Sequence, residues 1–257
     1  MFLSIYYLVA LVLVLTFHEF SHAWVANRLG DPTAKREGRL TLNPLAHIDI
    51  LGTLMLFLVG IGWGKPVPVN PQHFEKPVRD QALTALAGPL ANLVLAFFGA
   101  IPYSYLSSIS PLYQLGGAVL DLSVVLFLFN MLPIPPLDGS KFVGLFIPKR
   151  FYRGYELFLS KGLPYFIALM LVDLYLFERI FGMSFIWTAV SQLTYWLKAA
   201  ILLVVGVHFV LTSRQFVGRL LDDKRTTKLV RSITMDFGRR KAHGVSHRSK
   251  YIRLHGI

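Results

Sequence analysis

Residues 1–27 read MFLSIYYLVALVLVLTFHEFSHAWVAN, an apolar run that is long enough to cross a bilayer as a helix. Four further apolar stretches follow at 81–106, 113–132, 164–181 and 195–212. Of the 257 residues, 54% are hydrophobic and 16% are charged, whereas roughly a quarter of the residues in a soluble domain are charged. The sequence therefore predicts an all-α protein that crosses the membrane several times.

A shorter apolar stretch at 50–62 affects the predicted number of spans. It is short for a transmembrane helix, and a full crossing would export a basic loop later in the chain. The prolines in 63–71 cannot donate to a sheet ladder, so a strand there would lie at an edge, where it could receive an extended peptide. We expect five to six transmembrane helices with a re-entrant or edge-strand segment near 46–75.

The basic residues are distributed unevenly along the chain. Of the 26 Lys and Arg residues, seven lie in 28–80, five in 133–163 and twelve from 213 onward, whereas none lies in 107–112. Cytoplasmic loops of membrane proteins collect Lys and Arg. The distribution predicts a multi-pass protein of the inner or plasma membrane, with an extracytoplasmic N-terminus and a cytoplasmic tail. It also accounts for much of the net charge of +12 without nucleic-acid binding.

The composition divides the chain into a membrane-embedded part, 1–212, and a basic cytoplasmic tail, 213–257. Because no basic region precedes the first apolar run, we expect this run to remain in the mature protein. Lys198 lies beside Tyr195 and Trp196, a combination typical of the membrane interface. We expect Lys198 to anchor the last helix, with its amine reaching toward the outer surface.

The motif H-E-x-x-H occurs inside the first apolar run, at residues 18–22. Positions i and i+4 of a helix lie on one face, so His18 and His22 can bind one zinc ion while Glu19 lies beside the water that the metal activates. Three ionisable residues in an apolar helix are costly in lipid and usually belong to a functional site. The other interpretation is a polar cluster that packs helices together. The chain contains no cysteine, so histidine and carboxylate are the candidate ligands.

A catalytic zinc site usually has three protein ligands, so a third residue is needed. The segment 113–132 is predicted to run inward, and Asp138 follows it at a depth comparable to that of the two histidines. Prolines before Asp138 end the helix and allow the chain to turn the carboxylate toward the metal. His47 is the alternative ligand, although a loop histidine is more often structural.

Three further stretches accompany the H-E-x-x-H motif. Residues 130–139 read NMLPIPPLDG, residues 87–92 read AGPLAN and residues 41–49 read TLNPLAHID. In this order and combination, the motifs resemble those of the site-2 protease family of intramembrane zinc metalloproteases, in its compact bacterial branch. No PDZ or CBS domain is evident, so regulation by such a module is not expected.

The resemblance implies hydrolysis of peptide bonds in or near transmembrane segments, as in regulated intramembrane proteolysis. The implied partners are transmembrane protein substrates within the lipid bilayer, and the implied cofactor is one catalytic zinc ion. By the same resemblance, His18, His22 and Asp138 bind the zinc ion and Glu19 is the catalytic base. Asn92 becomes a candidate for a polar contact with substrate or oxyanion, whereas the residues alone equally allow a hydrogen bond to a neighbouring helix.

Two other classes of function remain open from the sequence. Asp121 and Asp173 are acids within apolar segments, which raises the alternative of a zinc or proton transporter. An inactive scaffold that binds transmembrane helices is the second alternative, and the intact Glu19 argues against it. The sequence specifies neither the substrate nor an oligomeric state.

Overall fold

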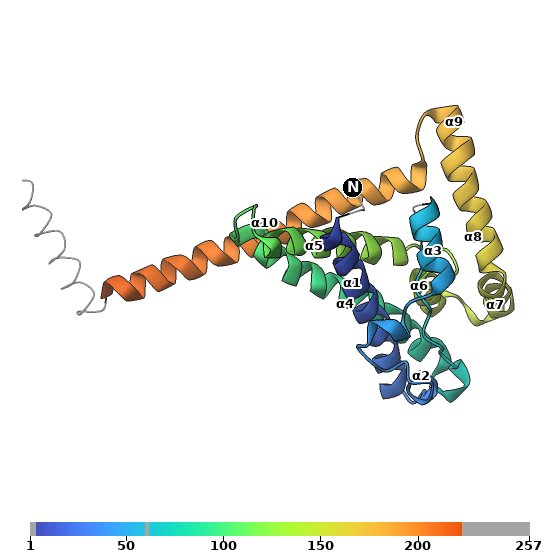
Figure 1. The fold of residues 1–257 in the computed structure, drawn as a ribbon. Helices are drawn as coiled ribbons and strands as arrows, with labels where there is room; N and C mark the ends of the chain where they lie inside the picture. Colours follow the sequence, from blue (N-terminus) through green and yellow to red (C-terminus); the bar gives the residue numbers. More distant parts are fainter. Residues whose placement is uncertain (1–3, 60–61, 223–257) are drawn as a thin grey trace, which may run out of the picture. The chain divides into compact units, whose positions relative to one another are not determined.

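The computed structural model describes residues 4–59 and 62–222. The regular elements in this part of the chain are helices, and no strand occurs among them (Figure 1). The chain divides into two compact units, residues 1–205 and residues 206–257, and the second is described only as far as residue 222. Most of the predicted basic tail thus lies outside the described residues. The predicted all-α class is confirmed.

Within the described residues, four helices are long and apolar enough to cross a membrane. They are α1 (Ile5–Arg28), α4 (Pro77–Tyr105), α5 (Pro111–Asn130) and the part Phe185–Gly206 of α10 (Phe185–Asp222). A fifth candidate is the pair Lys149–Ser160 and Gly162–Phe181, which is bent by 64° and could be one broken span. The protein is therefore a multi-pass membrane protein, with four or five such helices among the described residues. The upper number, five, agrees with the predicted five to six transmembrane helices.

Shorter elements connect these helices. They are α2 (Thr33–Arg36), η1 (Pro44–Ala46), α3 (Ile50–Val59), η2 (Pro71–His73), α6 (Asp138–Val143), η3 (Gly144–Phe146), η4 (Lys149–Phe151), α7 (Tyr152–Ser160), α8 (Gly162–Leu171), the π-helical η5 (Val172–Phe177) and α9 (Glu178–Phe181).

Helices α1, α4 and α5 pack against one another through small side chains. Ala10 and Ala118 belong to one buried cluster, and Ala96 and Ala100 belong to another. At the α4–α5 contact, a Cβ atom on Gly99 would lie 2.8 Å from the carbonyl oxygen of a residue on α5. Small residues let transmembrane helices approach closely enough for their backbones to be in contact. This close packing sets the register between the helices that carry the polar residues.

The stretch that contains α3 begins and ends at neighbouring positions. Ile48 and Gly64 form an antiparallel bridge, so the ends of the stretch 49–63 meet. The ten residues of α3 span about 15 Å, half of a bilayer core. Ends that meet agree with the predicted re-entrant segment, and among the described residues a single bridge occurs where the sequence allowed an edge strand.

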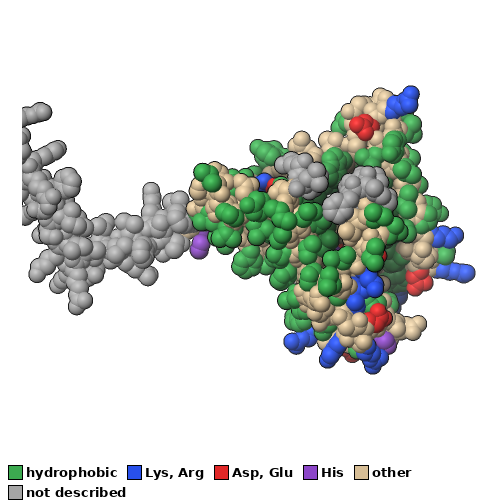
Figure 2. All heavy atoms as spheres, in the orientation of Figure 1, with side chains coloured by type: hydrophobic (Ala, Val, Ile, Leu, Met, Phe, Trp, Pro, Cys, Tyr) green, Lys and Arg blue, Asp and Glu red, His purple; other side chains and the backbone are tan. Residues whose placement is uncertain are grey.

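The polar loops gather at one end of the first unit. Figure 2 shows Lys and Arg side chains around the end that carries α2, whereas hydrophobic side chains cover much of the helical body on this face. Before the start of α10, Asp173 accepts hydrogen bonds from Ser184 Oγ and from the backbone N–H groups of Phe185 and Ile186. Asp173 therefore satisfies the first N–H groups of α10, as a helix cap does.

The expected interfacial role of Lys198 is wrong. Helix α10 begins at Phe185, well before the predicted start of the span, so Lys198 lies in the helix interior. Its Nζ atom forms an ion pair with Asp121 of α5 and lies 5.1 Å from the centroid of the Tyr103 ring. The Tyr7 hydroxyl donates to Asp121 Oδ2 at 2.9 Å. Pairing offsets the cost of a charge in lipid, which explains why Lys198 need not reach the surface.

Candidate metal centre

Helix α1 presents two histidines toward the interior. His18 and His22 are one helical turn apart and both are buried. Their Nε2 atoms lie 3.0 Å apart, and the ring planes meet at 84°. The i, i+4 spacing thus brings both ring nitrogens to one point, as the sequence predicted.

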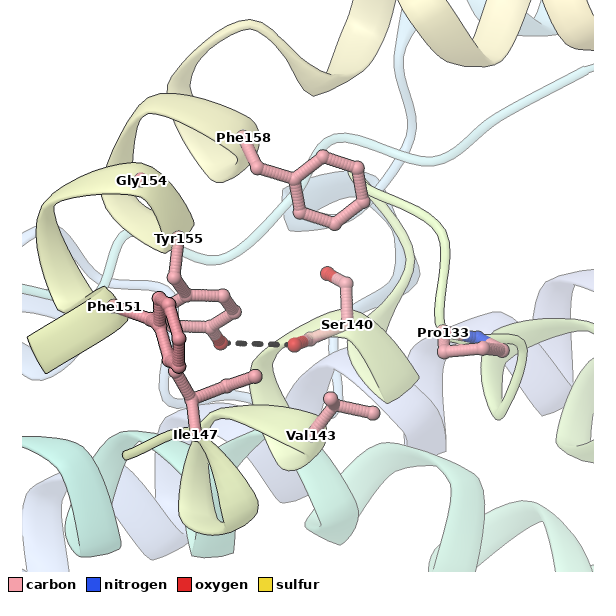
Figure 3. A pocket seen from close by; sticks show the side chains of 8 residues that line it. All are labelled: Pro133, Ser140, Val143, Ile147, Phe151, Gly154, Tyr155 and Phe158. Carbon is pink, nitrogen blue, oxygen red and sulfur yellow. Dashed lines mark hydrogen bonds between the residues drawn. The ribbon is translucent and has the colours of Figure 1, made fainter. Parts of the chain in front are cut away.

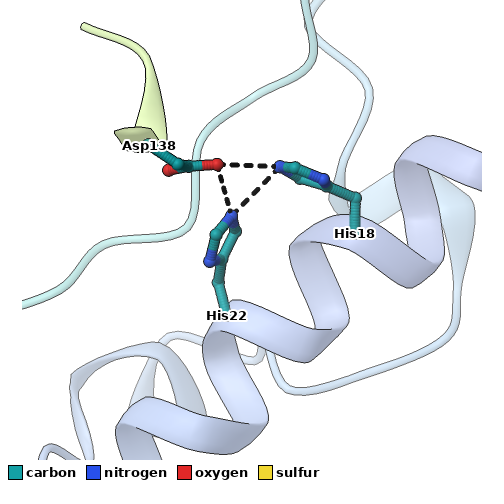
Figure 4. A group of neighbouring side chains, drawn as sticks. All are labelled: His18, His22 and Asp138. Atoms are coloured by element: carbon teal, nitrogen blue, oxygen red, sulfur yellow. Dashed lines mark hydrogen bonds and ion pairs between the residues drawn. The ribbon is translucent and has the colours of Figure 1, made fainter. Parts of the chain in front are cut away.

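Asp138 completes a triangle with the two rings. Its Oδ2 atom lies 3.2 Å from His18 Nε2 and 3.1 Å from His22 Nε2, and all three side chains point toward one another in Figure 4. These three residues form the group of candidate metal ligands found within the described residues. Ligand atoms at zinc–ligand distances of about 2.0–2.2 Å in a tetrahedron are about 3.3–3.6 Å apart. The two nitrogens and one oxygen therefore fit a zinc ion with little adjustment.

The chain after α5 positions Asp138. Helix α5 ends at Asn130, and α6 begins with Asp138 after a stretch that contains three prolines. A Cβ atom on Gly139 would lie 2.3 Å from the carbonyl oxygen of Met131, so α6 folds tightly against the end of α5. Burial raises the pKa of Asp138, but His22 and His18 lower that pKa more, so it lies well below its ordinary value. The ionised form of a carboxylate is the form that binds a metal ion.

Helix α4 forms the wall behind the histidines. Thr84, Gly88 and Asn92 follow one another at intervals of four residues and are all buried, so they share one face. The Thr84 carbonyl oxygen lies 2.7 Å from His22 Nδ1, and Asn92 Nδ2 lies 3.0 Å from His18 Nδ1. A Cβ atom on Gly88 would lie only 2.3 Å from His22 Nε2. Glycine at this position leaves the space between the two contacts open.

The catalytic-base candidate, Glu19, meets an extended segment that we call the strap, residues 63–70. Glu19 Oε2 accepts a hydrogen bond of 2.9 Å from the Val67 N–H. Pro66 and Pro68 flank Val67 and have no N–H, so Val67 supplies the donor in this part of the strap. The residue before a proline is restricted to extended conformations, which helps to hold this N–H in place.

The strap is fixed at both ends. At its start, the Lys65 N–H donates to His47 O at 2.9 Å and Arg39 donates to Lys65 O at 2.6 Å. At its end, the Asn70 N–H donates to the buried Asp31 carboxylate at 2.7 Å. Burial raises the pKa of Asp31, but hydrogen bonds from Thr33, Asn70 and others lower that pKa more, so the net shift is downward. Asp31 thus contributes stability that is present above its ordinary pKa and is lost as the pH falls through the lower folded value.

The structure does not bring His47 to the metal centre. His47 is buried, and its Nε2 atom lies 2.8 Å from the Thr41 carbonyl oxygen within the same loop. Its role in the structure is to order the loop and to accept the strap through its carbonyl. This arrangement favours Asp138 over His47 as the third ligand.

A cavity behind α6 is separate from the metal centre. Its volume is about 340 Å³ and its lining is mostly apolar (Figure 3). Residues two and five positions after Asp138 line it, and these positions lie on the other side of a helix from Asp138. The Tyr155 hydroxyl donates to Ser140 O at 2.8 Å across this region. The lining residues are Pro133, Ser140, Val143, Ile147, Phe151, Gly154, Tyr155 and Phe158.

Sequence reasoning assigned no role to Thr84, Gly88 or Val67. Gly88 and Asn92 form a G-x-x-x-N pattern whose four-residue spacing matches that of H-E-x-x-H, and this match could have indicated two facing helix surfaces. Thr84 and Val67 act through backbone atoms, which no residue-type pattern reveals. Their contributions depend on the packing between distant segments.

The comparisons with known proteins agree with this site. The chain is 43% identical over 152 residues to the Bacillus subtilis protein named "Putative zinc metalloprotease YwhC", which covers 56% of this chain and 69% of that protein. It is 36% identical over 132 residues to Mycolicibacterium smegmatis Rip2, of the same designation, over 49% of this chain and 51% of the relative. It is 28% identical over 170 residues to stage IV sporulation protein FB of Bacillus subtilis, over 61% of this chain and 57% of the relative. No protein-family model and no solved structure matches the chain.

Fold and site together define a helical, multi-pass membrane protein with a histidine–carboxylate cluster on an H-E-x-x-H helix. Such a set of ligands is typical of hydrolytic zinc sites. With the relatives described above, the chain belongs to the site-2 protease family. The resemblance inferred from the sequence motifs is confirmed.

Proposed function

We propose that the protein is an intramembrane zinc metalloendopeptidase that hydrolyses peptide bonds in or near transmembrane segments of membrane proteins. The observation that carries this proposal is the triangle of His18 Nε2, His22 Nε2 and Asp138 Oδ2. The two histidines and Glu19 belong to a helix that is apolar enough to span a bilayer. The designation of the relatives as zinc metalloproteases supports the reaction class. Their coverage of only part of each chain leaves the substrate to experiment.

His18, His22 and Asp138 would hold one zinc ion. When bound, zinc supplies a Lewis acid that lowers the pKa of water and polarises a carbonyl group. Glu19 follows His18 on α1, and its carboxylate interacts electrostatically with His22. We assign to Glu19 the transfer of a proton from water to the amine of the departing peptide. The Val67 N–H holds one carboxylate oxygen, which leaves the other oxygen to exchange the proton.

The substrate must present an extended peptide bond to this site. A transmembrane helix hides its peptide groups in i to i−4 hydrogen bonds, so it has to unwind locally before hydrolysis. Three N–H groups of the strap, those of Lys65, Val67 and Asn70, are already bonded within the protein, so fewer donors remain for a peptide that adds as a strand. A substrate that paired with the strap would find chiefly carbonyl acceptors there.

The two acids that raised the transporter alternative have another explanation in the structure. Asp121 is paired with Lys198 and Tyr7, and Asp173 caps α10, so both acids have structural partners. The scaffold alternative is tested by the same experiment as the proposal, because a scaffold binds the substrate helix without cleaving it.

The test uses Glu19→Gln in the purified protein in detergent. Wild type, zinc and single-span membrane peptides are incubated, and the products are identified by mass spectrometry. We expect the variant to retain one zinc ion per chain but to lose cleavage, because an amide fills the same space and cannot accept a proton. Cleavage at the wild-type rate by Glu19→Gln, or binding of peptide without cleavage by the wild type, would refute the proposal.

A further inference from the structure

Asn92 lies against the outer nitrogen of one metal-ligand candidate. Its side chain is fully buried within α4, and its amide nitrogen is 3.0 Å from His18 Nδ1. Its Oδ1 atom is buried and has no hydrogen-bond partner among the described residues. The His18 ring is therefore the polar group that the Asn92 amide contacts among the described residues.

The contact with Asn92 bears on the tautomer of His18. A neutral imidazole carries its proton on one nitrogen, and a nitrogen that binds a metal ion must be the other one. With the amide nitrogen of Asn92 facing it, His18 Nδ1 is the acceptor, so Nε2 carries the proton and donates toward Asp138. Metal binding at Nε2 instead requires a proton on Nδ1 and an acceptor opposite it.

We propose that Asn92 is a positioning residue that selects the metal-binding tautomer of His18. A half-turn of the carboxamide exchanges its oxygen and nitrogen at nearly the same positions, because the two groups are almost equal in size. Asn92 Oδ1 then accepts a hydrogen bond from His18 Nδ1–H, and His18 Nε2 is free to bind the metal. This inference rests on the proposed zinc site.

A backbone carbonyl on the same face of α4 positions His22. Its Nδ1 atom lies 2.7 Å from the Thr84 carbonyl oxygen, which can only accept, so His22 Nδ1 carries a proton and Nε2 is free. Helix α4 therefore holds His22 through a fixed backbone acceptor and His18 through an amide that can rotate. The two histidines differ in what sets their tautomer. The Thr84 carbonyl fixes the metal-binding tautomer of His22, whereas His18 has this tautomer when the Asn92 amide turns its oxygen toward the ring.

The burial of Asn92 separates this role from the substrate contact that the sequence suggested. The amide is enclosed within the helix bundle and already faces the His18 ring. A direct contact with a substrate carbonyl would require the amide to leave that ring. The positioning role requires no movement beyond rotation of the amide group.

The test compares Asn92→Leu, which has a similar size and no acceptor, with Asn92→Asp, which keeps an acceptor. Zinc affinity is measured on each detergent-purified variant by competition with a chelator. Loss of an outer hydrogen-bond partner of a metal ligand lowers metal affinity by about 10- to 100-fold. We expect this loss for Asn92→Leu and near wild-type affinity for Asn92→Asp. Ser123→Ala removes another buried polar group, on α5, and should bind zinc as the wild type does.

The second measurement identifies the tautomer directly. Two-bond correlation spectra of the ¹⁵N-labelled histidine rings in the zinc-loaded wild type should show a proton on Nδ1 of both His18 and His22. An unprotonated His18 Nδ1 would overturn the inference even if Asn92→Leu failed to fold. Wild-type zinc affinity in Asn92→Leu together with lost cleavage would also overturn it, in favour of a substrate contact. Failure of the wild type to bind zinc would instead contradict the proposed function.

Discussion

At the scale of single residues, the metal centre depends on which atom of each side chain is available. His18 and His22 direct Nε2 inward and are held from outside through Nδ1. Asp138 directs Oδ2 to both rings, while Lys141 Nζ lies 3.7 Å from Oδ1. Outer partners of this kind fix the orientation of ligands and are part of the metal site. The site therefore includes the outer partners on α4 and α6 as well as the ligands and the base.

The third ligand can be tested against the histidine that the sequence left open. Asp138→Ala removes one of the three expected ligands, so we expect cleavage to be lost. Loss of an outer partner lowers zinc affinity by about 10- to 100-fold, and loss of a ligand should lower it more. His47→Ala should keep stoichiometric zinc, because His47 bonds within its own loop. Zinc content is measured by inductively coupled plasma mass spectrometry, with His22→Ala as the reference for a lost ligand. Zinc retention in Asp138→Ala combined with zinc loss in His47→Ala would reverse the assignment.

The sequence was sufficient to predict that His18, His22 and Asp138 lie together, but not which residues contact them from outside. His18, Glu19 and His22 lie within one helical turn, so their relation follows from helix geometry alone. Asp138 required the further step of comparing depths in the membrane. The contact of Asn92 with His18 depends on the register between α1 and α4, which small residues in the helix interface set and which no local pattern encodes.

At the scale of elements, the strap links the catalytic-base candidate to the polar loops. It is bonded to the loop before α3 at one end and to the turn after α1 at the other. Sequence analysis anticipated extended backbone there because of the prolines, but it assigned the free edge to a substrate. The structure shows instead that the central donor of the strap bonds Glu19.

Substitutions at Val67 separate this backbone bond from side-chain packing. Val67→Pro removes the N–H that Glu19 accepts, whereas Val67→Ala keeps it and shortens only the side chain. A hydrogen bond to a charged group contributes about 1.5–3 kcal/mol, so its loss is expected to lower kcat by about 10-fold or more. KM and zinc affinity should change little. Equal activity of the two variants would show that the strap does not position Glu19.

The last helix shows why the sequence did not predict where this element begins. Polar residues such as Thr188 and Gln192 lower the hydropathy of the first part of α10, so the apolar run was predicted to begin at 195. The helix in fact begins at Phe185, after the turn at Gly182 with a φ of 70° and the cap at Asp173. The partner of Lys198 on α5 lies 77 positions away in sequence, which no local window can detect.

At the scale of the whole membrane domain, helix directions follow from the contacts in the site. The C-terminal half of α1 meets the N-terminal half of α4, because His18 and His22 contact Asn92 and Thr84. The end of α5 leads to Asp138 at the same place. We therefore expect the loops after α1 and after α5 to lie on one side of the membrane and the loop between α4 and α5 to lie on the other. The re-entrant return of 49–63 preserves this order.

The contacts fix which loops share a side, and the basic residues predict which side that is. The loops 28–80 and 133–163 hold twelve Lys and Arg residues, whereas 107–112 holds none, so the metal centre is expected on the cytoplasmic side and the N-terminus outside. The chain has no cysteine, so Ser108→Cys and Arg153→Cys each provide one thiol for a membrane-impermeant maleimide. In intact spheroplasts the reagent should label Ser108→Cys and should reach Arg153→Cys only after the membrane is permeabilised. Labelling of both positions from outside would contradict the helix directions, whereas the reverse pattern would keep those directions and invert the protein in the membrane.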